Sequence, residues 1–171
     1  MEAAPRAHSR TGAAADPNVI RTMRLHYGLE DAGWATVTLE SADQRVEMAA
    51  SYLHDSLRDL ASAARALVGG AAEVRVVFMD EPGEHELIMR RASATAVDVE
   101  ILWHEHWESW KMEGGQGKRK LLGSTSVADV RGQILSELKH LLHENGEAGY
   151  RRKWVEHDFP VAEMRELEEA G

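Results

Sequence analysis

The sequence has 171 residues, of which 43% are hydrophobic and 29% are charged, a composition typical of a globular domain. It contains no cysteine, which excludes disulfide scaffolds, thiolate metal sites and cysteine nucleophiles. Twenty lysine and arginine residues against 29 aspartate and glutamate residues give a formal charge of −9. No segment carries the basic excess that binding to a nucleic-acid backbone requires, so we expect no nucleic-acid ligand and favour a basic protein partner.

The beginning of the chain carries no targeting signal that we recognise. Residues 1–6 lack the apolar core of a secretory signal, and no apolar run approaches the ~18 residues of a membrane-spanning helix. We therefore expect a cytoplasmic protein with no membrane partner. Residues 1–18 are rich in alanine without periodicity and predict a disordered tail. Residues 19–33 fit neither the helical nor the strand period and form an uncertain lead-in. A single α+β domain is expected over residues 34–171.

The ordered body is predicted to begin near Trp34 with a hairpin, because polar and apolar residues alternate over 34–40 and again over 45–50. Apolar residues then recur every three or four positions from Leu53 to Val68. This spacing predicts an amphipathic helix that is capped by Ser51 and stops at Gly69-Gly70. Its apolar stripe includes Leu53, Leu57 and Leu60.

Four more strands are expected, at residues 73–79, 85–91, 96–104 and 120–123. A second helix is predicted from the Ser126 cap to Asn145-Gly146, and a short final helix follows Pro160. Consecutive strands with short connections cannot be parallel neighbours, because parallel pairs need long crossovers. The predicted fold is therefore α+β, an antiparallel sheet of about six strands with two main helices on one face and a short C-terminal helix.

Four carboxylates lie within seven residues at the turn between the strands predicted at 73–79 and 85–91. Catalytic carboxylate pairs need one pKa that burial raises, and a turn seldom supplies this burial. The plain interpretation is a solvated turn, and the functional one is an acidic surface for a basic partner. The predicted surface consists of Asp80, Glu81, Glu84 and Glu86.

Two tryptophans, Trp107 and Trp110, lie just beyond the strand predicted at 96–104. They either pack in the core or serve as exposed anchors beside the acidic turn, because exposed tryptophan is typical of binding hot spots. With that turn, they form the predicted partner-binding site of a non-enzymatic protein-binding domain.

The alternative function is metal binding at the stretch His104-Glu105-His106. If the strand continued past residue 104, alternation would place both imidazoles on one face, an arrangement that suits zinc or another divalent ion. A third ligand is not identified by any spacing, and the plain interpretation is a polar strand end. The nucleophile elbow, the phosphate loop and the His-Glu-x-x-His helix are absent from the sequence. We therefore predict no catalytic residues and no required cofactor, with a zinc-dependent domain or enzyme as the alternative.

The segment 150–160 combines large aromatic and charged residues. It is too polar for a core helix and too aromatic for a free tail. We predict that Tyr150, Trp154 and Phe159 clamp this segment onto the body and that its role is structural.

Three stretches carry a resemblance: Ser51-Tyr52-Leu53, residues 78–85, and residues 149–160 with Trp154 and His157-Asp158-Phe159-Pro160. Together they look like a family of small uncharacterised actinobacterial proteins, over roughly residues 33–167. The layout and the acidic, tryptophan-rich character also resemble immunity proteins of bacterial polymorphic-toxin systems, which bind and block a cognate toxin. The resemblance implies a basic toxin as partner and no catalytic residues. A homodimer through a sheet or helix face is a further alternative.

Overall fold

The computed structural model describes residues 22–110, 116–155 and 157–171, except for the side chain of Trp110. Within these residues the chain forms strands and helices in the order βββαββββαα, with a 3-10 turn before the last strand. Their bounds are β1 (Met23–Leu29), β2 (Trp34–Ser41), β3 (Gln44–Ser51), α1 (Ser56–Val68), β4 (Glu73–Met79), β5 (Glu84–Arg91), β6 (Ala96–His104), η1 (Glu108–Trp110), β7 (Lys118–Ser126), α2 (Val127–Lys153) and α3 (Val161–Glu169). The expected tail at residues 1–18 lies outside the described residues.

The described strands form two antiparallel sheets, β1-β2-β3 and β4-β5-β6-β7. The α+β class and the antiparallel pairing are confirmed, whereas the single sheet of about six strands was wrong. Helix α1 separates β3 from β4 in the chain, and these two strands do not pair as a hairpin. The two sheets contact each other between β3 and β4 and also at β7. At β7 the Gln44 side chain accepts a hydrogen bond from the Leu122 backbone (3.1 Å) and donates one to it (2.8 Å).

The lead-in at residues 19–33 contains strand β1, so the ordered body begins before Trp34, contrary to the prediction. Met23, Leu25 and Tyr27 are buried, while Arg24 and His26 between them are exposed. This is the alternation of a strand with one face on the core. The apolar side chains are few and diverse, and for this reason the pattern was hard to recognise in the sequence.

The free edge of β1 is covered by helix α2. Four residues of helix advance about 6 Å and two residues of strand about 6.6 Å, so side chains spaced four apart can follow alternate strand amides. The covered edge is thereby protected from pairing with another chain. The amides of Met23, Leu25 and Tyr27 donate to Asp129 (2.7 Å), Gln133 (3.3 Å) and Glu137 (2.9 Å), respectively.

Helix α1 starts five residues later than its predicted cap. Ser51 is the last residue of β3, and Asp55 caps the helix by accepting a hydrogen bond from the backbone of Arg58 (3.4 Å). Leu53 therefore lies in the preceding loop with 38% of its surface exposed, not in the buried stripe. Leu57 and Leu60 are buried as predicted.

Helix α2 begins at the predicted cap, where the Ser126 hydroxyl accepts a hydrogen bond from the amide of Asp129 (3.0 Å). The side of this helix that faces the core includes Ile134 and Leu138, which are buried. The predicted break at Asn145-Gly146 is confirmed, because Gly146 has non-helical backbone angles (φ 62°, ψ 169°). A further helical stretch, which the sequence analysis did not predict, follows Gly146 as far as Lys153.

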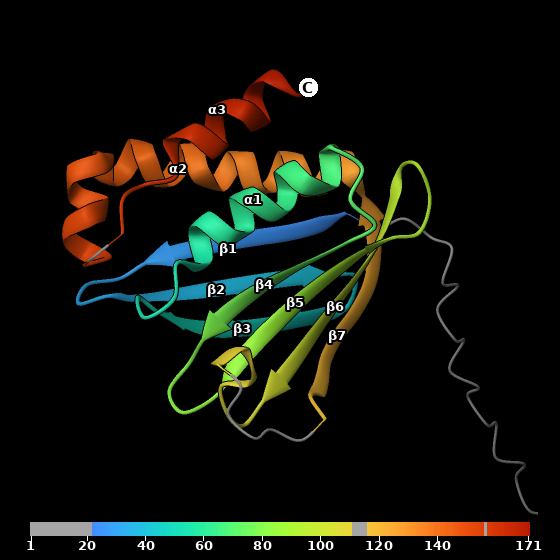
Figure 1. Cartoon of the computed structure of the whole chain (residues 1–171), viewed down its shortest axis with the longest axis horizontal. Helices are drawn as coiled ribbons and strands as arrows, with labels where there is room; N and C mark the ends of the chain where they lie inside the picture. Colours follow the sequence, from blue (N-terminus) through green and yellow to red (C-terminus); the bar gives the residue numbers. More distant parts are fainter. Residues whose placement is uncertain (1–21, 111–115, 156) are drawn as a thin grey trace, which may run out of the picture.

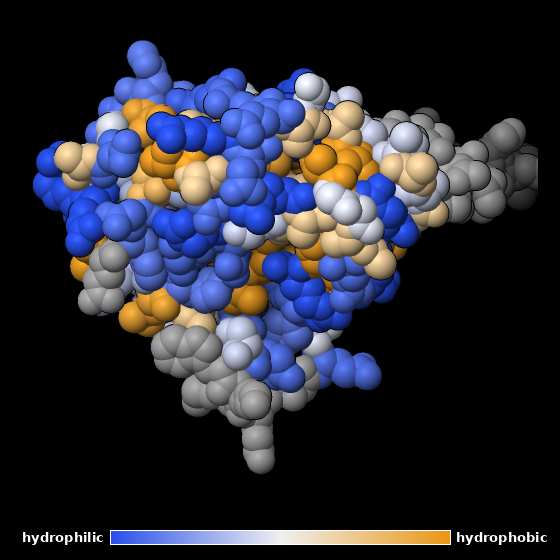
Figure 2. Space-filling view, turned by 45° about the horizontal axis from the view of Figure 1, so that its top comes forward, coloured by the Kyte–Doolittle hydropathy of each residue, from blue (hydrophilic) through white to orange (hydrophobic). Residues whose placement is uncertain are grey.

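The three helices lie together on one side of the sheets (Figure 1). Helix α1 packs against β4 and helix α2 packs against β1. Viewed with the helices brought forward, the surface is mostly hydrophilic, with separate apolar patches (Figure 2). Among the described residues, no helix has both the length and the apolar character needed to cross a membrane.

Candidate functional site

The acidic turn and the His-Glu-His stretch meet at one end of the four-stranded sheet. Strand β4 ends at Met79, β5 begins at Glu84, and Glu84 pairs with His104 at the end of β6. The turn and the short η1 helix lie together at the bottom of Figure 1. We call residues 80–86 and 104–109 the tip. It contains the predicted Asp80, Glu81, Glu84, Glu86, His104, His106 and Trp107.

Glu84 holds the tip together and is not a surface carboxylate as expected. Only 2% of the residue is exposed. Its two oxygens accept hydrogen bonds from the amide (2.8 Å) and hydroxyl (2.6 Å) of Ser109. Glu84 thus fixes the loop after β6 to the start of β5, and removing it would leave both Ser109 donors without this acceptor.

Glu86 belongs to a chain of alternating charges on the outer face of the sheet. It accepts a hydrogen bond from Arg75 (2.8 Å) and lies 3.4 Å from Nε2 of His104. Hydrogen bonds from arginines, led by that of Arg90, hold the pKa of Glu100 below its usual value. The charge of Glu86 is therefore balanced within the protein. The network of ion pairs continues from Arg75 to Glu73 (2.8 Å), from Glu73 to Arg90 (2.7 Å), from Arg90 to Glu100 (2.8 Å) and from Glu100 to Arg119 (2.7 Å).

Trp107 is half-buried and its ring is fixed by the acidic turn. The indole Nε1–H donates to the carbonyl oxygens of Asp80 (2.7 Å) and Gly83 (3.0 Å). The backbone of the turn lies so close to the end of β6 that residue 83 must be glycine, because a Cβ there would lie 2.4 Å from the carbonyl oxygen of His104. Trp110 belongs to η1 by its backbone, and its side chain lies outside the described residues.

A hollow of about 410 Å³ lies beside this ring, lined by Glu81, Pro82, His106 and Trp107. Glu81, Glu105 and Glu108 are exposed in the tip. None of the three has an ion pair with any residue that the structure describes. The tip therefore combines a hollow, lined in part by proline and tryptophan, with exposed negative charge.

The two histidines of the metal alternative are not on one face. Strand β6 ends at His104, which is buried, and His106 lies beyond it and is exposed. Over the described part of the chain, no group of three or more histidine, aspartate or glutamate side chains is arranged to hold a metal ion. The neighbouring His85 faces the core against Trp103, with ring centroids 4.6 Å apart, and burial lowers its pKa to about 4.

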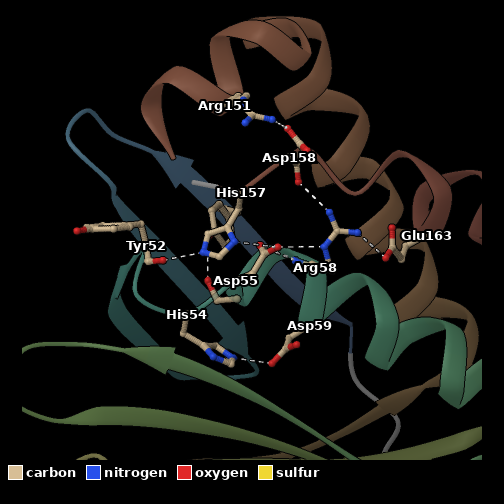
Figure 3. A network of polar contacts seen from close by, with 11 residues as sticks. Tyr52, His54, Asp55, Arg58, Asp59, Arg151, His157, Asp158 and Glu163 are labelled. Atoms are coloured by element: carbon tan, nitrogen blue, oxygen red, sulfur yellow. Dashed lines mark hydrogen bonds and ion pairs between the residues drawn. The ribbon is translucent and has the colours of Figure 1, made fainter. Parts of the chain in front are cut away.

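A second polar cluster joins the loop before α1 to the segment after α2 (Figure 3). Arg58 donates to Asp55 (3.0 Å), to Glu163 (2.7 Å) and to the carbonyl oxygen of Asp158 (3.0 Å). Nε2 of His157 donates to the carbonyl oxygen of Tyr52 (2.7 Å), and its Nδ1 lies 3.6 Å from Asp55. Both ring nitrogens of this histidine therefore face protein oxygens.

The aromatic residues of the same segment are buried as predicted. Tyr150 and Trp154 have no exposed surface, and Phe159 is 4% exposed. The rings of Tyr150 and Phe159 meet edge to face with centroids 5.3 Å apart. We call residues 52–59 and 150–163 the C-terminal clamp. The predicted burial of these three aromatics against the body is confirmed.

Sequence reasoning missed several residues of both clusters. Glu105 and Glu108 flank Trp107 in the sequence, so counting charge around the tryptophan would have added them to the acidic surface. The bond between Glu84 and Ser109 has no local signal, because it depends on how β5 and β6 pair. Known protein families, curated proteins and solved structures were searched, and none matches this chain.

Proposed function

We propose that the protein is a non-enzymatic binding domain whose acidic tip holds a basic surface of a protein partner. One observation carries the proposal: Glu81 lines a hollow with Pro82 and Trp107, and Glu81, Glu105 and Glu108 are exposed at the tip with no ion pair among the described residues. By contrast, Glu73, Glu86 and Glu100 on the outer face of the four-stranded sheet all pair with arginines.

Electrostatic attraction would act mainly on the encounter of the two proteins. Complementary charges raise association rates and disfavour wrong partners, and salt screens them over a Debye length of about 8 Å at physiological ionic strength. The net charge of −9 adds to the local field of the tip. We therefore expect binding that weakens steeply as salt increases.

The resemblance to immunity proteins extends this proposal to the identity of the partner. Such a protein would bind a basic toxin in the cytoplasm and would need no cofactor. Metal binding centred on His104 and His106 is the alternative, and stoichiometric zinc in protein purified without a histidine tag would favour it. A homodimer through a sheet or helix face would appear as a doubled mass in light scattering.

The direct test is capture of the partner from the native host, followed by mass spectrometry and titration of the purified pair. The tip variant replaces Glu81, Glu105 and Glu108 by glutamine. Its matched control replaces the exposed helix residues Glu144, Glu147 and Glu169 by glutamine, which changes the net charge equally. The proposal predicts a basic partner that the control retains and the tip variant loses. Equal binding by both variants would contradict it.

A further inference from the structure

We infer that the hollow at the tip receives an arginine side chain of the partner, an inference that rests on the proposed function and names the group recognised. The hollow is small, since about 410 Å³ lies near the lower end of the ~300–1,000 Å³ range of ligand sites. It therefore suits one side chain better than a folded surface.

The lining of the hollow favours a group with an apolar stem and a charged head. Pro82 and Trp107 supply apolar walls, and Glu81 supplies a carboxylate at the same hollow. A cation over an indole ring is attracted by the electrons of the ring, and tryptophan is the best side chain for this contact. An anionic or wholly apolar group would leave the Glu81 carboxylate unmatched.

Arginine fits this combination better than lysine. Its planar guanidinium stacks on aromatic rings and can donate two parallel hydrogen bonds to one carboxylate, whereas the lysine ammonium is a more strongly hydrated point charge. The ring that would receive it is already oriented, because Nε1 of Trp107 donates to Asp80 and Gly83. A receptor fixed in advance loses less freedom on binding.

The test uses three defined probes on the full chain: the N-acetyl amides of arginine, lysine and citrulline. Citrulline has nearly the shape of arginine but no charge. The readout is the indole N–H signal of Trp107 in ¹⁵N-resolved spectra, assigned by its loss in Trp107→Phe. We expect a saturable shift with arginine, weaker binding of lysine and no saturable shift with citrulline. Glu81→Gln keeps the ring in place and should weaken arginine binding roughly two- to fivefold.

An equal response to citrulline would overturn the requirement for a cation, and a tighter response to lysine would overturn the choice of arginine. No shift at Trp107 with any probe, or an unchanged affinity in Glu81→Gln, would overturn the inference. These results are separable from the proposed function, because partner capture by the tip and control variants is measured independently. If the tip variant lost the partner but the Trp107 signal did not respond to the arginine probe, the proposed binding function would stand and the arginine pocket would be refuted.

Discussion

The tip and the C-terminal clamp look alike in composition, since each joins aromatic and charged side chains from segments far apart in the sequence. They differ in how the charged groups are used. In the clamp, Arg58 contacts Asp55, Glu163 and the carbonyl oxygen of Asp158. In the tip, Glu81 and Glu105 are exposed and have no ion pair among the described residues. The comparison teaches that, in a cluster of polar and aromatic residues, the charged groups without an ion pair in the described part of the chain are the ones that point to function.

The largest expected effect breaks the clamp at its centre. Trp154→Ala removes a side chain with no exposed surface, whose ring meets Tyr27 edge to face with centroids 6.2 Å apart. Replacing a buried aromatic by alanine usually costs about 3–5 kcal/mol. Urea unfolding should show a loss of this size. A loss below about 1 kcal/mol would show that the segment contributes little to the fold.

The next effect is the pH dependence of the free energy of unfolding, which should have opposite signs for a histidine in the tip and a histidine in the clamp. Burial lowers the pKa of His85 to about 4, whereas the bond to Asp59 raises the pKa of His54 in the clamp. As pH falls, His85 takes up a proton in the unfolded chain at a higher pH than in the folded chain. Its contribution to the free energy of unfolding is therefore full above about pH 6.5 and decreases towards pH 4, by up to about 3 kcal/mol. His54 contributes below about pH 6.5, and its contribution is lost as pH rises through its raised pKa.

His85→Gln tests this directly, because it removes the acid-sensitive group and keeps a polar side chain. Unfolding free energies at pH 7, 6, 5 and 4.5 should fall less steeply in the variant than in the natural chain. The difference between the two slopes isolates His85 from the carboxylates, which titrate in both proteins. Parallel curves would mean that His85 is not the group responsible.

A smaller effect is expected from the polar part of the clamp. Arg58→Met removes three hydrogen bonds and leaves the largely buried Glu163 without its partner, at an expected cost of about 1–3 kcal/mol. Arg65→Met is the matched control, because its pair with Glu166 is exposed on both sides and should contribute under about 1 kcal/mol. Equal losses in urea unfolding would remove the distinction between the two pairs.

The smallest effect on stability is expected at the tip. Neutralising Glu81, Glu105 and Glu108 together removes no ion pair among the described residues, so the unfolding free energy should stay within about 0.5 kcal/mol per site. Glu84→Gln is different, because Glu84 is buried and accepts two bonds from Ser109. If the three exposed changes destabilised the protein as much as Glu84→Gln, their carboxylates would be structural.

Much of the fold followed from local patterns. Alternation located β2 to β6, and the spacing of apolar residues located α1 and α2, because one buried face imposes its period on the sequence. The start of α1 was misplaced because Ser51 and Asp55 are both good caps, and the length of β3 decides between them. The division into two sheets depends on contacts between distant strands, such as Gln44 with Leu122, which no local pattern encodes.

The site was predictable only in its location. The acidic turn and Trp107 were recognisable because charge and tryptophan are conspicuous in a sequence. Which carboxylates remain exposed was not, because Glu84 and Glu86 share one face of β5 but meet different neighbours: Ser109 in the loop after β6 for Glu84, and Arg75 and His104 on β4 and β6 for Glu86. The buried contact of Glu84 and the paired charge of Glu86 both arise from strand register.

The most direct test of the account is the affinity of the captured partner for the tip variant, measured at low and physiological salt beside the helix-control variant. The account predicts that the tip variant loses affinity at least tenfold at low salt, about 1.4 kcal/mol, while its unfolding free energy is unchanged. It also predicts that the control binds like the natural chain. Equal affinities for the tip variant and the control would contradict the claim that the exposed carboxylates of Glu81, Glu105 and Glu108 hold the partner.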